Sequence, residues 1–323
     1  MCVGAAAMDF IFTVEEFPSP DAMVFAKGEP MLVPGGSTAN IAVGLSRLGV
    51  GSRFVGKVGA DENGLTLKTA FEKDGVDTSW LVFDPAGRTA QTIIVVDGQG
   101  RRIIYSLGGT ALLETPHELD PSAIEGTDLL YIGEAFPDVA RRAAALARER
   151  GARVVCGPGG TASWVPIHAL MELLREADYV LLSRGELMSL MSSAGARSSG
   201  DHRDGATWLL CNGIRNAVVT LGQGGAVCYS SGGTCPTADG APVGVTGTSV
   251  AQACFRVQAV DTTGAGDAFS AGFMSALLDG LPTAECLRRG NACAALAIQR
   301  VGAREAMPTR GELDEFLEGS TAS

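Results

Sequence analysis

The stretch DTTGAGDAFSAGF, residues 261–273, joins a glycine-rich turn to the start of a helix. Gly264 and Gly266 leave backbone N–H groups uncovered where the helix begins, and the positive end of the helix dipole favours an anion there. A phosphoryl group in transfer suits such a site. Asp267 follows in the first turn, where its carboxylate can accept the proton of an attacking hydroxyl. The alternative is a tight turn in which Asp267 only complements the helix dipole.

Strand-like and helix-like segments alternate on both sides of this stretch. Apolar runs bounded by turn residues predict strands at 128–136, 152–160, 179–183, 216–225, 226–230 and 255–260. Apolar residues at helical spacing predict helices at 37–48, 138–150, 167–176, 203–212 and 283–300, besides the one that contains Asp267. Such alternation is typical of a mostly parallel sheet covered by helices on both faces.

The N-terminal third adds a second kind of β-structure. The opening CVGAAAMDFIF, residues 2–12, reads as one buried strand that emerges at Asp9. Residues 89–105 form two β-rich runs joined by DGQG, a strong hairpin signal. The proline-punctuated stretch at 15–34 could hardly be helical. We therefore expect a small β-sheet lid made of residues 13–33 and 89–110, and an α/β core made of residues 1–12, 34–88 and 111–323.

Composition narrows the class of protein. The formal net charge of −11 opposes general binding to nucleic acid or to anionic membranes. No stretch approaches the ~18 apolar residues of a membrane span, and the opening MCVGAAAMDF lacks a basic leader. The eight cysteines form neither a CxxC pair nor a cluster at zinc spacing, which favours reduced thiols and a cytoplasmic location over disulfides.

Several motifs together resemble the ribokinase family, also called the PfkB carbohydrate kinases. In the family's order, the chain carries GAAAMD, GGSTAN, GKVGADENG, the hairpin, VVTLGQGG and DTTGAGD. One glycine motif alone would be weak evidence, but several in order are strong. The resemblance covers nearly the whole chain. It implies an α/β fold with a ribokinase-like three-layer α/β/α core, a mostly parallel sheet and a small β lid.

The resemblance also implies roles for single residues. Asp267 would be the catalytic base, and Gly264, Ala265 and Gly266 would form an anion hole. The substrate would be held by Asp9, Gly35, Gly36, Asn40, Glu134, Arg102 and Asp267. ATP would be held by Thr220, Gly222, Gly225, Gly264, Gly266 and Asn291. The plainer alternatives are an ordinary strand exit at 220–225, a solvated loop carboxylate at Glu134 and a helix cap at Asn291.

Arg101 and Arg102 lie on the predicted lid hairpin. A guanidinium there could reach a phosphate or an anionic substrate, because its planar fork of donors suits such groups. The alternative is a solvent-facing pair on an edge strand.

Two cation sites follow from the resemblance. Many members carry an Asn-x-x-Glu motif whose glutamate helps to hold Mg²⁺ through water, and here the string runs from Ser183 to Glu186 with serine in place of asparagine. Some members, including ketohexokinase-like ones, also show a serine followed by a basic residue. In several relatives the carbonyls around Asp261 and Thr263 bind a monovalent cation, so K⁺ is a candidate cofactor beside ATP and Mg²⁺.

The sequence thus predicts an ATP-dependent kinase that phosphorylates a hydroxyl of a small sugar of the pentose or ketohexose type. One alternative is a nucleoside acceptor, which would need an aromatic platform such as Phe12, Phe25 or Phe136. Another is a sugar or nucleotide sensor that has lost turnover. A dehydrogenase is disfavoured because no GxGxxG follows the first strand. The expected partner is a small sugar or polyol, and a homodimer through the lid stays open.

Overall fold

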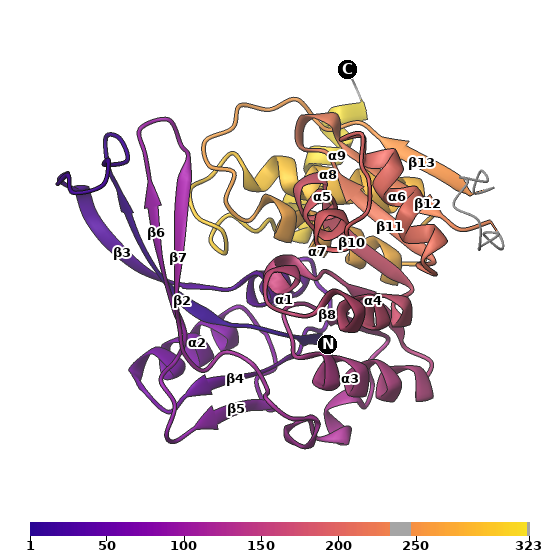
Figure 1. The fold of residues 1–323 in the computed structure, drawn as a ribbon, viewed down its shortest axis with the longest axis horizontal. Coiled ribbons are helices and arrows are strands. Elements are labelled where there is room, and N and C mark those ends of the chain that lie inside the picture. Colours follow the sequence, from indigo (N-terminus) through magenta and orange to yellow (C-terminus); the bar gives the residue numbers. More distant parts are fainter. Residues whose placement is uncertain (233–246, 322–323) are drawn as a thin grey trace.

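Figure 1 shows the computed structural model, which describes residues 1–232 and 247–321. Within these residues the large sheet has nine strands in the order β13-β12-β11-β10-β9-β8-β1-β4-β5. Their bounds are β1 Cys2–Val3, β4 Phe54–Gly59, β5 Leu81–Asp84, β8 Leu129–Ile132, β9 Arg153–Cys156, β10 Tyr179–Ser183, β11 Asn216–Thr220, β12 Ala226–Ser230 and β13 Thr248–Gln252. Neighbours pair in parallel from β5 to β11, whereas β12 runs antiparallel to β11 and to β13.

Helices cover both faces of this sheet (Figure 1). Their bounds are α1 Ser37–Arg47, α2 Glu62–Lys73, α3 Pro137–Glu149, α4 Ile167–Glu176, α5 Arg184–Ser193, α6 His202–Cys211, α7 Ala265–Leu278, α8 Thr283–Ala297 and α9 Arg310–Thr321. One hydrophobic core joins the sheet to α1, α2, α7, α8 and α9, and the other joins it to α3, α4, α5 and α6. The predicted three-layer α/β/α architecture is therefore confirmed.

Helix α3 shows how local sequence builds such a layer. Pro137 stands at its first position, where the missing N–H costs nothing. Ala140, Ala143, Ala144 and Ala147 are fully buried at helical spacing. Their small side chains let the helix approach the sheet closely, while its arginines remain on the outer side.

The lid is a four-stranded sheet that stands to one side of the core (Figure 1). Its order is β3-β2-β6-β7, with β2 Ala7–Thr13, β3 Lys27–Gly35, β6 Gln91–Val96 and β7 Arg102–Gly108. The predicted hairpin is confirmed as β6 and β7, which pair antiparallel. The predicted boundary after residue 12 is wrong, because residues 7–12 already belong to the lid. The expected opening strand is in fact two strands in two sheets, since the chain leaves the large sheet at Gly4.

The predicted strand at 255–260 is also wrong. The sheet closes earlier, with β13 at Thr248–Gln252. Asn291 on α8 donates to the carbonyl oxygens of Gln252 and Ala253, 3.0 Å each, and so takes up backbone groups that a longer strand would need. Residues 253–260 therefore follow an irregular path.

No helix in the described part of the chain is long and apolar enough to cross a membrane.

Asp61 fastens the base of the lid to the core. Its Oδ1 accepts hydrogen bonds from Gly64 N (2.9 Å) and Thr89 Oγ1 (2.5 Å), and its Oδ2 accepts one from Thr89 N (2.9 Å). The carboxylate therefore caps α2 and also fixes the chain where it enters β6. Burial alone would raise the pKa of Asp61, but these hydrogen bonds together lower it.

We expect Asp61→Ala to lower the free energy of unfolding by about 2 kcal/mol, because one helix cap and two further hydrogen bonds to an ionised group are lost. Urea denaturation at neutral pH measures the change. Asp120→Ala is the matched control, since Asp120 accepts one bond from Ser122 N on an exposed turn. Equal losses in the two variants would contradict this role of Asp61.

Candidate active site

The N-terminus of α7 forms the centre of the site. Gly264 has a φ of 75°, and a Cβ there would lie 2.8 Å from the Cα of Ala303, so only glycine fits without strain. No side chain caps this helix. Among the described residues, the N–H groups of Gly266 and Asp267 have no hydrogen-bond acceptor. The helix therefore presents unpaired donors and the positive end of its dipole to an anion.

Asp267 lies beside these donors and is held from a second helix. Ser37 Oγ donates to its Oδ1 at 2.6 Å, and Asn40 Nδ2 donates to its Oδ2 at 2.9 Å. Burial raises the pKa of Asp267 to about 7, against the effect of these two bonds, and the charges of Glu134 and Glu186 add to the rise. A carboxylate with such a pKa can take up a proton and release it near neutral pH.

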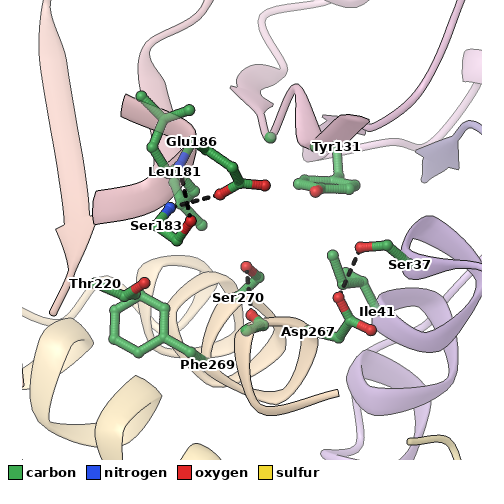
Figure 2. A pocket seen from close by; sticks show the side chains of 14 residues that line it. Ser37, Ile41, Tyr131, Leu181, Ser183, Glu186, Thr220, Asp267, Phe269 and Ser270 are labelled. Atoms are coloured by element: carbon green, nitrogen blue, oxygen red, sulfur yellow. Dashed lines mark hydrogen bonds between the residues drawn. The ribbon is translucent and has the colours of Figure 1, made fainter. Parts of the chain in front are cut away.

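A small cavity of about 90 Å³ opens beside Asp267. Figure 2 shows Glu186 and Tyr131 facing each other across it, with the Ser37–Asp267 hydrogen bond on another side. It is lined by Ser37, Ile41, Tyr131, Gly157, Gly159, Leu181, Leu182, Ser183, Glu186, Thr220, Gly266, Asp267, Phe269 and Ser270. Two predicted site carboxylates from distant parts of the chain therefore share one cavity.

Glycines beside α1 shape the predicted substrate side. A Cβ on Gly35 would lie 1.9 Å from Asp9 Oδ2, and Gly36, with a φ of 97°, would press a Cβ to 2.8 Å from the carbonyl oxygen of Ala5. Asp9 accepts a hydrogen bond of 2.5 Å from Thr92 Oγ1. Burial raises the pKa of Asp9, while Thr92 and Arg304 act in the opposite direction. Gly35 thus lets the Asp9 carboxylate lie directly against the backbone, and Gly36 allows the close approach of Ala5.

Glu134 follows β8 and is held by α1. Thr38 Oγ1 donates to its Oε2 at 2.9 Å, and Thr38 itself is fully buried. A Cβ on Gly159 would lie 2.6 Å from Glu134 Oε1. Burial raises the pKa of Glu134. The side chain is therefore fixed inside the protein rather than solvated on a loop.

A larger cavity of about 640 Å³ lies on the other side of the loop that precedes α7. Gly222, Phe255, Ala265 and Asn291 are among its lining residues, and its walls are largely apolar. Its size and character suit a nucleobase with its ribose. The predicted ATP residues divide in space, because Gly222 and Asn291 line this cavity and Thr220 lines the small one.

Gly225 lines neither cavity. Its φ is 82°, and a Cβ there would lie 2.1 Å from the carbonyl oxygen of Gln252. Asn291 donates to that same carbonyl oxygen. These two residues hold the strand end that leads into the wall of the larger cavity.

The lid contacts the loop at residues 261–264, called the phosphate loop below, through Arg102, whose Nη1 donates to Thr263 Oγ1 at 3.2 Å. Asp261 accepts bonds from Thr263 N and Gly302 N, 2.9 Å each. Burial would raise the pKa of Asp261, but these bonds and Arg102 lower it. The Asp261 carboxylate therefore fixes the loop. The neighbouring Arg101 does not take part in this contact, because it forms an ion pair with Asp97.

A protein-family model described as pfkB family carbohydrate kinase matches residues 1–310. The chain belongs to the pfkB family of carbohydrate kinases. Fructokinase-1 of Zea mays is 30% identical to it, with 98% of this chain and 96% of that protein covered. The ATP-dependent ribose-1-phosphate kinase of Halopiger xanaduensis is also 30% identical, with 98% and 97% covered. The structure of ribokinase from Thermotoga maritima matches with a TM-score of 0.82 at 26% identity and covers 98% of each chain.

Membership of the pfkB family confirms the predicted resemblance, and the chain is a phosphotransferase acting on sugar hydroxyls. Sequence reasoning missed the residues that hold the predicted ones in place. Ser37 and Thr38 stand inside the quoted GGSTAN, and their position between the glycines and Asn40 was the available signal. Tyr131 carried no signal of its own, because a tyrosine in a buried strand reads as core.

The departure from the pfkB-family motif at Ser183 has a structural explanation. Ser183 Oγ accepts a bond from Glu186 N (3.1 Å), and Glu186 Oε2 accepts one from Ser183 N (2.6 Å). This capping box starts α5 and turns the glutamate carboxylate toward the small cavity (Figure 2). The main-chain N–H of Ser183 therefore orients the Glu186 carboxylate, and the Ser183 hydroxyl caps the helix.

The residues of this cavity fit a magnesium ion that is shared with phosphates. In the described part of the chain, no cluster of three or more His, Cys, Asp or Glu could hold a metal alone. Mg²⁺ usually keeps several waters and takes one or two carboxylates plus substrate phosphates. Glu186, which lines this cavity together with Asp267, matches that requirement.

Ser37→Ala should move the acid limb of the kcat/KM profile to higher pH by roughly one unit, because a hydrogen bond that favours ionised Asp267 is lost. Activity requires the ionised base, so the variant should lose most activity below about pH 7. Initial rates between pH 5 and 9 measure the shift. Ser270→Ala is the control, since Ser270 lines the same cavity but donates to Gly266 O. An unchanged limb in Ser37→Ala would count against Asp267 as the titrating group.

Proposed function

We propose that this pfkB-family kinase transfers the γ-phosphoryl group of ATP to a hydroxyl of a small sugar of the pentose or ketohexose type, with Asp267 as general base. The observation that carries the proposal is the half-buried Asp267 carboxylate next to the unpaired N–H groups of α7. Asp267 takes the proton of the attacking hydroxyl, and the N–H groups stabilise the charge of the phosphoryl group in transfer.

The nucleotide is assigned to the larger cavity, with Gly222 and Asn291 at its wall and its phosphates directed toward Gly264 and Gly266. A relative with 30% identity is named an ATP-dependent kinase, which supports ATP as the donor. Mg²⁺ neutralises phosphate charge when bound, and Glu186 would hold it through water. K⁺ is assigned to the carbonyl oxygens around Asp261 and Thr263, since the Asp261 carboxylate is already occupied by two backbone N–H groups.

The acceptor is assigned to the space between Asp9, Gly35, Gly36, Asn40 and Asp267. Relatives are named fructokinase and ribose-1-phosphate kinase, which supports a sugar and makes a sugar phosphate a second acceptor to test. Arg102 is the lid residue that would meet an added phosphate.

A nucleoside acceptor has less support. Phe12 lies in a groove with Ile103 and Tyr105 on the opposite face of the lid from Asp9. Phe25 is 80% exposed, and Phe136 packs edge-on against Trp164. None of the three lines the cavity beside Asp267, and each lacks the placement of a base-stacking platform there.

Asp267→Asn should lower kcat by a factor on the order of 10³ or more and leave the dissociation constant of ATP nearly unchanged, because the base is lost and the anion hole is kept. ADP release with fructose, ribose, ribose 1-phosphate and adenosine measures turnover, and calorimetry measures ATP binding. Asp279→Asn, on the exposed end of α7, is the control. Near-normal turnover in Asp267→Asn would remove the assignment, and turnover with adenosine alone would replace the sugar by a nucleoside.

We further propose that the protein forms a homodimer through the outer face of the lid. Phe10 pairs with Leu32 and with Ile93, and Ile93 pairs with Tyr105, so these four side chains share one face of the sheet. Phe10, Leu32 and Tyr105 are 38%, 50% and 54% exposed. Their other face carries Asp9 and Thr92 and turns toward the acceptor. An apolar sheet face of this kind usually marks an interface.

Leu32→Glu should convert the dimer to a monomer, because it places a charge in the centre of the apolar face. Light scattering coupled to size-exclusion chromatography at micromolar concentration measures the mass. Leu65→Glu is the matched control, since Leu65 is a similarly exposed leucine (59%) on α2. A monomeric wild-type chain, or a Leu32→Glu variant that stays dimeric, would refute the interface.

A further inference from the structure

Arg304 is a buried guanidinium that the proposed reaction does not use. Its side chain is 3% exposed and lies over the ring of Phe71, 4.9 Å from the centroid. It forms no ion pair with any described residue, and its Nε and Nη1 atoms have no hydrogen-bond partner among them. Its one hydrogen bond runs from Nη2 to the carbonyl oxygen of Gly35, 3.4 Å away. Buried donors without partners are costly, so this arrangement calls for an explanation.

The surroundings of Arg304 belong to the acceptor side. Gly35 is the residue that makes room for Asp9 Oδ2, and Arg304 holds its carbonyl oxygen. Asp9 and Arg304 interact electrostatically, each favouring the charged form of the other. Burial lowers the pKa of Arg304 to about 10; Asp74, Glu305 and then Asp9 oppose this shift, whereas Arg47 adds to it. Arg304 is thus the buried cation that acts on the Asp9 carboxylate.

Asp9 needs such a partner in order to hold hydroxyls. Thr92 Oγ1 donates to its Oδ1, and no described residue donates to its Oδ2, which is therefore available to a ligand. A carboxylate accepts two ligand hydrogen bonds only when it is ionised. Burial disfavours that form, and a nearby positive charge restores it.

We infer that Arg304 is a positioning residue for acceptor binding, which acts through Asp9 and the Gly35 carbonyl without touching ATP. The inference rests on the proposed sugar-kinase function. The same segment also supports the phosphate loop, because Ala303 lies against Gly264 and Gly302 N donates to Asp261 Oδ2. The Arg304 side chain binds the carbonyl oxygen of Gly35 and acts on Asp9, which both lie on the acceptor side. Its loss should therefore weaken binding of the acceptor and leave binding of ATP unchanged.

A purely structural role is already filled by Arg47. Its Nη1 donates to the carbonyl oxygens of Arg304, Glu305 and Met307, and its guanidinium pairs with Asp74. Those bonds fix the backbone of the segment whatever side chain stands at 304. Arg47→Gln therefore loosens the segment and leaves the charge beside Asp9 in place, which makes it the matched control.

Arg304→Gln should raise KM for fructose or ribose roughly 10- to 100-fold, within the usual range of coupling between interacting residues, and leave kcat and KM for ATP within about threefold. Arg304→Lys should recover most of the acceptor affinity, because it keeps the positive charge. Arg47→Gln should change KM for ATP and KM for the sugar by similar factors, because the segment that it loosens supports both sides. Coupled ADP-release kinetics on the full chain give these constants, and calorimetry with the sugar alone gives acceptor binding independently of turnover.

A double-mutant cycle tests whether Arg304 acts through Asp9. In an Asp9→Asn background, Arg304→Gln should cost less than about threefold in acceptor affinity, since the charge it supports is already gone. Additive losses would overturn the inference, as would equal losses for ATP and sugar in Arg304→Gln or an Arg304→Lys variant no better than Arg304→Gln. A wild-type chain that phosphorylates no sugar would refute the proposed function. If the wild-type chain phosphorylates a sugar and Arg304→Gln has the same KM for that sugar, only the inference about Arg304 is refuted.

Discussion

The structure depends on the contact between α1 and α7, which carries the hydrogen bonds from Ser37 and Asn40 to Asp267. The partners lie 230 and 227 residues apart in the chain, so only the packing of the two helices brings them together. That packing needs small residues, because a Cβ on Gly44 would lie 2.8 Å from the Cβ of Ala271. Close approach of the helix backbones therefore places the Asp267 carboxylate from one motif within reach of donors from another.

The electrostatics of the site follow from this placement. Asp267, Glu134 and Glu186 face a common interior region, and their mutual repulsion adds to burial in raising the pKa of Asp267. The positive end of the α7 dipole lies beside Asp267, and Arg102 on the lid acts on Asp261. A phosphate-bearing ligand with a divalent cation completes the charge balance, whereas a neutral ligand alone leaves the carboxylates uncompensated.

Sequence patterns predicted the core of the fold and the turns that shape the candidate site because these features are local. The glycines at 264 and 266, the GGSTAN segment and the DGQG turn each fix a backbone shape within a few residues. The errors arose where distant parts decide the outcome. Residues 7–12 look like a continuation of β1, but they pair with β3 and β6. Residues 255–260 look like a strand, but Asn291 binds the carbonyl oxygens of Gln252 and Ala253, at the point where β13 would have to continue into them.

The residues that no sequence pattern revealed share one property. Each holds a predicted residue or segment in place. Thr38 fixes Glu134, Ser37 fixes Asp267, and Asp61 fixes the entry of the lid. A hydroxyl or carboxylate of this kind has no recognisable spacing, since its partner is chosen by the fold. The chemical groups of a site are therefore legible in sequence, whereas their orientation, on which a reaction at a buried carboxylate depends, is a property of the packed structure.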